Sequence, residues 1–80
     1  MTKPYILAVE DEEALAILIK FNLEKEGFEV KCVNQGEKAF DLIEERTPDL
    51  IILDWMLPDT SGIKIAKEIR SLDYTRDIPI

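Results

Sequence analysis

Two apolar runs that end directly in acidic residues constrain the fold of this chain most strongly. The run Tyr5–Val9 leads into Glu10 and Asp11, and the run Leu50–Leu53 leads into Asp54. Each run has the length of a strand and lacks the polar alternation of a half-solvated strand, which predicts parallel strands covered on both faces. In an open parallel sheet, ligands bind outside the carboxyl ends of the strands. We therefore expect the three acids to meet there.

A cluster of three carboxylates is stabilised by a bound cation. Like charges at close range repel one another, and the cost falls when a positive ion lies between them. Oxygen ligands are those that Mg²⁺ prefers, so the residues themselves indicate Mg²⁺ as the companion of this site.

Composition narrows the function further. The chain has 80 residues, a formal net charge of -7 and a single cysteine, Cys32, with no histidine. A chain of this length forms one domain at most, and its acidity argues against binding of DNA, RNA or anionic lipid by this segment itself. Cys32 has no disulfide or zinc partner and is expected to be a small buried side chain in a reducing compartment. No signal peptide or membrane span is visible, so a cytoplasmic protein without membrane contact is predicted.

Strand and helix patterns alternate along the whole chain. Asp11 is the predicted N-cap of a first helix that ends at about Glu26 because Gly27 follows, and Ser61 is the predicted cap of a third helix. The period-two pattern of the second strand suits a position nearer the sheet edge. The remaining predicted elements are strands at 5–9, 28–33 and 50–54, a second helix at 36–46 and the start of a fourth strand at 78–80.

The predicted βαβαβα pattern has no stopping signal at its end. It closes with the first three residues of another strand, Ile78–Ile80, and leaves the strand at 50–54 with an unpaired edge. We therefore expect a fragment of a longer protein that is poorly stable or self-associating alone, a homodimer being one form of that association.

The first helix carries more apolar surface than one core stripe needs. At 100° per residue, Leu15, Ile19 and Leu23 form the predicted core stripe. Further apolar residues widen the arc beyond it and form a candidate docking face for a partner beside the acids. They are Ala14, Ile17, Leu18 and Phe21, of which Leu18 and Phe21 could equally belong to the rim of the core.

The order of motifs resembles one known family. Glu10-Asp11-Glu12 follows a strand, and the segment 54–58 (DWMLP) with Gly62 follows another. This combination resembles the receiver domain of bacterial two-component response regulators, and the segment 75–79 (TRDIP) resembles their winged-helix transcription-factor branch. The resemblance implies a flavodoxin-like α/β domain, doubly wound, with five parallel strands in the order 2-1-3-4-5. Residues 1–80 then form a partial receiver domain, truncated to (βα)3 plus the start of strand 4.

The resemblance also implies roles for single residues. Asp54 is the implied acceptor of a phosphoryl group from a sensor histidine kinase. Asp11 and Asp54 would ligate Mg²⁺ through their side chains, Met56 through its backbone carbonyl, and Glu10 through a water. The protein is then a phosphorylation switch rather than an enzyme.

Other family features bear on the loop and on what lies outside the chain. Pro58 and Gly62 would shape the loop after the acceptor. The Ser or Thr and the Lys that complete the family switch are not within the 80 residues, since Ser61 and Thr75 lie on the wrong elements. DNA would be bound only through a further domain, and the kinase would dock beside the acids on the first helix.

Two alternative functions remain at this stage. A Mg²⁺-dependent phosphotransferase, phosphatase or nuclease needs an Asp-x-Asp pair after the third strand, and Met56 occupies the second position of that pair. A pseudo-receiver, which is an interaction module that is never phosphorylated, would usually lack one of the acids, and here Glu10, Asp11 and Asp54 are all present. Taken singly, these acids are more often a helix cap or a strand end, so the argument depends on their joint occurrence.

Overall fold

Strands and helices alternate along the chain as the sequence predicts. The computed structural model describes residues 3–54, 61–72 and 77–80. The elements, in chain order, are β1 (Tyr5–Val9), α1 (Glu13–Lys25), β2 (Glu29–Val33), α2 (Gly36–Glu45), β3 (Leu50–Leu53) and α3 (Gly62–Ser71). All lie within about one residue of their predicted ranges.

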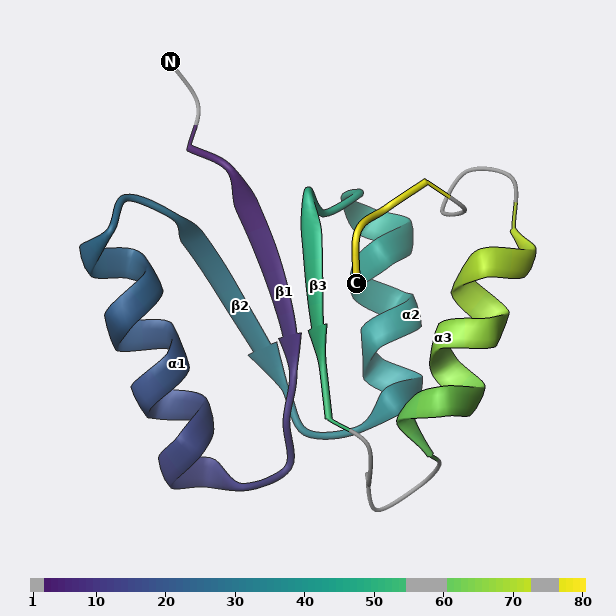
Figure 1. Cartoon of the computed structure of the whole chain (residues 1–80), viewed down its shortest axis with the longest axis horizontal. Helices are drawn as coiled ribbons and strands as arrows, with labels where there is room; N and C mark the ends of the chain where they lie inside the picture. The colour runs from purple at the N-terminus through teal and green to yellow at the C-terminus, as the bar shows by residue number, and fades with distance from the viewer. Residues whose placement is uncertain (1–2, 55–60, 73–76) are drawn as a thin grey trace.

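The three strands form one parallel sheet in the order β2-β1-β3. The arrowheads in Figure 1 therefore all point in the same direction, toward the end of the sheet where the carboxyl ends of the strands lie. All five residues of the central strand β1 are buried, as expected of a strand that is paired on both edges and covered on both faces. The order confirms the first three strands of the flavodoxin-like arrangement, and β2 lies at the predicted edge.

The helices cover the two faces of the sheet unequally. Helix α1 lies on one face, and α2 and α3 lie together on the other (Figure 1). The face under α2 and α3 holds the larger buried cluster, which comprises Leu7, Val9, Ala39, Ile43, Ile51, Ile65, Ile69 and Ile78. Burial of these side chains contributes most of the apolar stabilisation of the fold.

The face under α1 is less well covered. Among the described residues, the buried cluster there consists of Ile6, Ala8 and Val30, with Ile19 and Leu23 of α1 packed against them and still partly exposed. The prediction that Leu15 belongs to the core stripe is wrong, because 42% of Leu15 is exposed. Leu15 lies in the first turn of α1. Figure 1 shows that this end of the helix lies at the carboxyl ends of the strands, where the sheet that α1 covers comes to an end.

Two residues near α1 test predictions made from the sequence: Cys32 packs against this helix, and Gly27 ends it. Cys32 of β2 is half-buried rather than fully buried, and its Sγ lies 3.7 Å from the carbonyl oxygen of Ala16 in α1. Gly27 has a φ of 96°, the left-handed conformation that ends a helix and that glycine adopts without strain. The predicted end of α1 is therefore confirmed.

The amino ends of the strands are held by paired polar groups. The backbone N–H of Tyr5 donates to Oδ2 of Asp49 over 2.7 Å, and the N–H of Asp49 donates to the carbonyl of Tyr5 over 2.8 Å. Nη1 of Arg46 lies 2.7 Å from Oε2 of Glu29, and its guanidinium carbon lies 4.4 Å from the centre of the Tyr5 ring. These contacts join β1 to β2, to the end of α2 and to the start of β3.

Residues 77–80 lie along the outer edge of β3 without forming a regular strand. The N–H of Ile51 donates to the carbonyl of Pro79 over 2.9 Å, and Nη1 of Arg70 donates to the carbonyl of Ile78. Ile78 itself is buried. The predicted start of a fourth strand thus has the predicted place, next to β3, and within residues 77–80 the bond from Ile51 to Pro79 joins its backbone to that strand.

Candidate functional site

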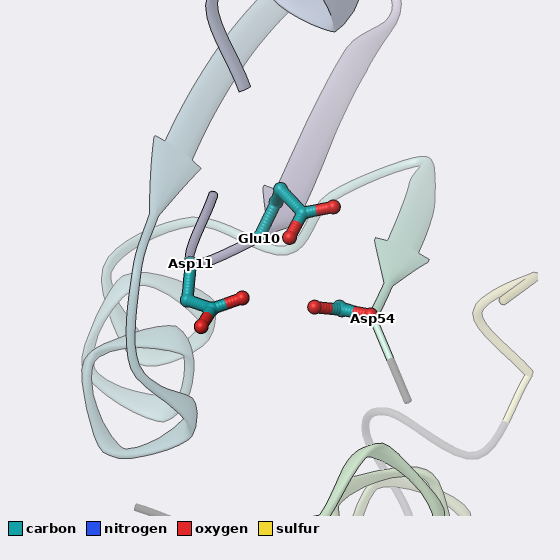
Figure 2. Close-up of side chains that lie close together, drawn as sticks. All are labelled: Glu10, Asp11 and Asp54. Carbon is teal, nitrogen blue, oxygen red and sulfur yellow. The ribbon is translucent and has the colours of Figure 1, made fainter. Parts of the chain in front are cut away.

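Three carboxylates gather at the carboxyl ends of β1 and β3. Glu10, Asp11 and Asp54 each offer an oxygen, and these oxygens all lie within 4.8 Å of one another. Figure 2 shows the carboxylates of Asp11 and Asp54 directed toward a common space, with that of Glu10 beside them. The meeting of these acids is the arrangement that the two apolar runs predict.

Sheet hydrogen bonds fix the two acids that follow the strands. The N–H of Glu10 donates to the carbonyl of Val33 at the end of β2 over 2.9 Å, and the N–H of Asp54 donates to the carbonyl of Val9 over 3.0 Å. Each acid therefore lies one residue beyond its strand but continues the hydrogen bonding of the sheet. The backbone of both acids is therefore held by the same hydrogen-bond pattern as the strands.

Glu10 is the least exposed of the three clustered acids. It retains only 9% of its accessible surface, and its Oε2 accepts a hydrogen bond from the backbone N–H of Glu12 over 3.2 Å. Desolvation raises the pKa of Glu10 above its usual value, and the neighbouring carboxylates of Asp54 and Asp11 raise it further, while the bond from Glu12 acts in the opposite direction. Ionisation of Glu10 in this site therefore costs free energy.

Asp11 does not cap α1, so this prediction is wrong. The N-cap is Glu12, whose carboxylate accepts a hydrogen bond from the N–H of Leu15 over 2.7 Å, and α1 begins at Glu13. Asp11 is exposed and takes part in the carboxylate cluster instead. Sequence reasoning gave Asp11 the cap because aspartate is a preferred N-cap residue and glutamate is not.

The donor set fits a hard divalent cation. All three groups are carboxylates, which are ligands for Mg²⁺ or Ca²⁺, whereas zinc sites are built mainly from nitrogen and sulfur ligands. Asp11 is exposed, so one side of the cluster is open to water, and Mg²⁺ usually keeps several waters when it is bound by a few carboxylates.

Comparison with known proteins decides the family. Residues 6–80 match the family model of the response regulator receiver domain. The chain belongs to the response regulator receiver domain family. It is also 51% identical, over 77 residues, to the phosphate regulon transcriptional regulatory protein PhoB of Rhizobium meliloti (strain 1021), a match that covers 96% of this chain and 34% of that protein.

Solved receiver structures share the fold. The non-phosphorylated HemR receiver domain from Leptospira biflexa is 35% identical with a TM-score of 0.87, over 96% of this chain and 60% of that one. The response regulator protein TrrA from Thermotoga maritima, solved in complex with Mg²⁺ and BeF, is 37% identical with a TM-score of 0.83, over 89% of this chain and 62% of that one. The receiver described here thus spans about a third of its curated relative and less than two thirds of these structures.

Other site predictions for the receiver meet the structure only in part. Met56 and Pro58 lie outside the described residues, so the carbonyl ligand and the loop role stay predictions. Gly62 is buried as the first residue of α3, and the predicted cap Ser61 is confirmed, since its Oγ accepts from the N–H of Lys64 over 3.2 Å.

The predicted docking face of the receiver is exposed. Ile17, Leu18 and Phe21 of α1 expose 62%, 55% and 62% of their surface, and Ala14 is exposed as well. Leu15, which is 42% exposed, adds to the exposed apolar surface of the helix. The view that Leu18 and Phe21 are rim core is therefore not supported, and the role of this apolar face in docking stays a prediction.

A separate hollow of about 750 Å³ lies between β3 and α3, and Asp54 borders it. Its other lining is mainly aliphatic, from β3 and from Ile63, Ala66 and Ile80, and Lys67, Arg70 and Ser71 of α3 form its polar part. The acids that could hold a cation lie at its end, and they define the candidate site. None of the helices in the described part of the chain is long and apolar enough to cross a membrane.

Proposed function

We propose that this receiver accepts a phosphoryl group on Asp54 with the help of Mg²⁺, as the switch of a two-component response regulator. The observation that carries the proposal is the cluster of Glu10, Asp11 and Asp54 within 4.8 Å at the carboxyl ends of two adjacent parallel strands. Three carboxylates that repel one another at this distance favour a site that is completed by a cation and used for chemistry.

Asp54 is the best placed acceptor of the three. Glu10 is almost fully buried and accepts a hydrogen bond from Glu12, and Asp11 lies at the approach to α1. Asp54 follows β3, is only partly buried and also borders the hollow next to α3. Its backbone is fixed by the bond to Val9, which holds the nucleophile in one position.

The proposed step is a single in-line displacement. A carboxylate oxygen of Asp54 attacks the phosphorus of a phosphohistidine on the donor, the P–O bond forms, and the P–N bond breaks. The leaving imidazole takes up a proton, and Asp54 becomes an acyl phosphate. A bound Mg²⁺ would supply the positive charge that lets an anion approach a phosphoryl group. Glu10 and Asp11 have the role of holding that ion beside the nucleophile.

The partners follow from the same proposal. A sensor histidine kinase is the donor and would dock on the exposed apolar face of α1, formed by Ala14, Ile17, Leu18 and Phe21. The similarity to PhoB supports a transcriptional regulator that binds DNA through a winged-helix domain outside these residues. We place this receiver in the cytoplasm, where such a kinase would deliver its phosphoryl group, and we include homodimer formation in the proposal.

Chemical labelling tests the proposal directly. Full-length protein is incubated with a small acyl phosphate donor with and without Mg²⁺, and the modified residue is mapped by mass spectrometry after reduction of the acyl phosphate with borohydride. We expect Mg²⁺-dependent modification of Asp54, its loss in Asp54→Asn and its reduction in Asp11→Asn. Asp41→Asn, the same change on the exposed side of α2, is the matched control and should label normally. Normal labelling of Asp54→Asn would show that the acceptor is wrongly assigned.

The exposed apolar face of α1 supports a second candidate. A pure interaction module would use this face and would neither label nor bind Mg²⁺. Absence of labelling together with absence of Mg²⁺ binding in calorimetry of the folded full-length protein would favour this second function.

A further inference from the structure

The start of α1 contradicts the local preferences of its own sequence. Aspartate is among the preferred N-cap residues and glutamate is not, yet Glu12 caps the helix and Asp11, one residue earlier, does not. Sites where local preference is overruled are often functional ones. Here the residue removed from the cap position is one of the three acids of the candidate site.

Two contacts link Glu12 to both sides of this arrangement. Its carboxylate accepts from the N–H of Leu15 over 2.7 Å, and its carbonyl accepts from the N–H of Ala16 over 3.0 Å, so its backbone is fixed as the residue before the helix. Its own N–H then donates to Oε2 of Glu10 over 3.2 Å. The cap and the hold on Glu10 therefore depend on the same backbone position.

We propose that Glu12 is a positioning residue of the carboxylate site, an inference that rests on the proposed Mg²⁺-dependent function. By capping α1, Glu12 keeps Asp11 out of the cap position and leaves its carboxylate with Glu10 and Asp54. It also aims its N–H at Glu10. Glu12 does this without being one of the three clustered carboxylates.

Loss of the Glu12 side chain has a defined structural consequence. Asp11 is then the nearest competent cap, and as N-cap it would accept a hydrogen bond from the N–H of Ala14, the third residue of a helix that begins one residue earlier. Its carboxylate would turn toward the helix end and away from Asp54. The N–H of residue 12 would take a helical direction and release Glu10.

Three variants of the full-length protein separate capping from charge. Glu12→Ala removes the cap and one negative charge, whereas Glu12→Ser removes the same charge and restores a preferred cap residue. Glu13→Ala removes a neighbouring negative charge in the first turn and leaves Glu12 in place. Mg²⁺ affinity is measured by calorimetry, and amide hydrogen exchange of Ala14 and Leu15 is measured by NMR on the metal-free protein.

We expect Glu12→Ala to bind Mg²⁺ about fivefold more weakly, the factor that corresponds to the loss of one helix cap. The amide of Leu15 should exchange faster and that of Ala14 more slowly, because the cap moves to Asp11. Glu12→Ser should return Mg²⁺ affinity and Leu15 protection to within about twofold of the wild type, and Glu13→Ala should leave both near wild type.

Other outcomes overturn the inference. Equal weakening in Glu12→Ala and Glu12→Ser would mean that charge, rather than capping, acts on the site. Unchanged exchange of Ala14 and Leu15 in Glu12→Ala would mean that Asp11 does not take the cap. If the wild type itself binds no Mg²⁺, the proposed function fails, and the exchange measurement alone then decides whether Glu12 keeps Asp11 from the cap.

Discussion

At the amino end of the sheet Arg46 lies between Glu29 and the ring of Tyr5, whereas at the carboxyl end three carboxylates lie within 4.8 Å of one another. Opposite charges and donor-acceptor pairs join elements at the first end. Like charges are crowded together at the second. The two ends of one sheet therefore use charge in opposite ways.

This difference separates stability from function within a few residues of the same strands. Paired groups lower the free energy of the folded state, while clustered carboxylates raise it and are kept where a ligand can offset their repulsion. We expect substitutions at the amino end to destabilise the fold without lowering the affinity of the carboxylate cluster for Mg²⁺. Substitutions at the carboxyl end should do the reverse.

The largest expected effect is that of Mg²⁺ on stability. At a concentration of about 100 times its dissociation constant, Mg²⁺ should raise the free energy of unfolding by about 2.7 kcal/mol, because it binds only the folded carboxylate cluster. The double variant Asp11→Asn/Asp54→Asn should lose this gain and be at least as stable as the wild type without metal. Urea unfolding at constant ionic strength, with Asp41→Asn as control, measures both. An equal gain in the double variant would show that Mg²⁺ does not stabilise the protein through the carboxylates at the carboxyl end of the sheet.

Asp49→Ala should have the next largest effect. It removes the carboxylate that accepts from the N–H of Tyr5, and hydrogen bonds to charged groups contribute about 1.5 to 3 kcal/mol, so we expect a loss of about 2 kcal/mol in the free energy of unfolding. Asp49→Asn keeps an acceptor and should lose less. If both variants unfold at the wild-type urea concentration, the bond at the amino end does not stabilise the sheet.

Glu10 should make the stability of the protein depend on pH. Burial and the neighbouring carboxylates raise the pKa of Glu10 in the folded state above the unfolded value of 4.5. Between these two pKa values the folded state binds more protons, so its stability should rise as pH falls from neutrality toward about 4.5 and be lost again as pH rises. Metal-free wild type should thus gain stability relative to Glu10→Gln over this range in urea unfolding. A difference between the two proteins that is constant with pH would contradict the prediction.

Arg46→Ala should give the smallest effect. The side chains of Arg46 and Glu29 are 47% and 42% exposed, and exposed ion pairs and cation–π contacts contribute roughly 1 kcal/mol or less each. We expect a loss of about 1 kcal/mol in the free energy of unfolding, reduced at high salt. Mg²⁺ affinity should stay at the wild-type value. A change in Mg²⁺ affinity larger than about twofold would show that the two ends are not independent.

The sheet and the acids of the site could be predicted because both follow from local patterns. A continuous apolar run predicts a buried parallel strand, and parallel strands bring the residues that follow them to one edge of the sheet, which places Glu10 and Asp54 together. Gly27 and Ser61 marked helix ends through conformation and capping, and both are confirmed. The family resemblance from these motifs is confirmed by the match over residues 6–80.

The features that were mispredicted depend on contacts that are remote in sequence or on competition between neighbours. Asp11 loses the cap to Glu12 although its intrinsic preference is stronger. Leu15 fits the helical stripe, but its burial depends on where the sheet ends beneath α1. The contacts of Tyr5 with Asp49 join residues 44 positions apart, which no local pattern indicates.

The paired bonds between Tyr5 and Asp49 have a consequence for the opposite end of the sheet. They permit one alignment of β1 with β3. Because side chains alternate between faces, the smallest slip that keeps the core intact is two residues, or about 6.6 Å at a rise of about 3.3 Å per residue. That displacement exceeds the 4.8 Å span of Glu10, Asp11 and Asp54. The register that brings the carboxylates together is therefore held at both ends of the strands, and Tyr5 and Asp49 hold it at the end away from the three acids.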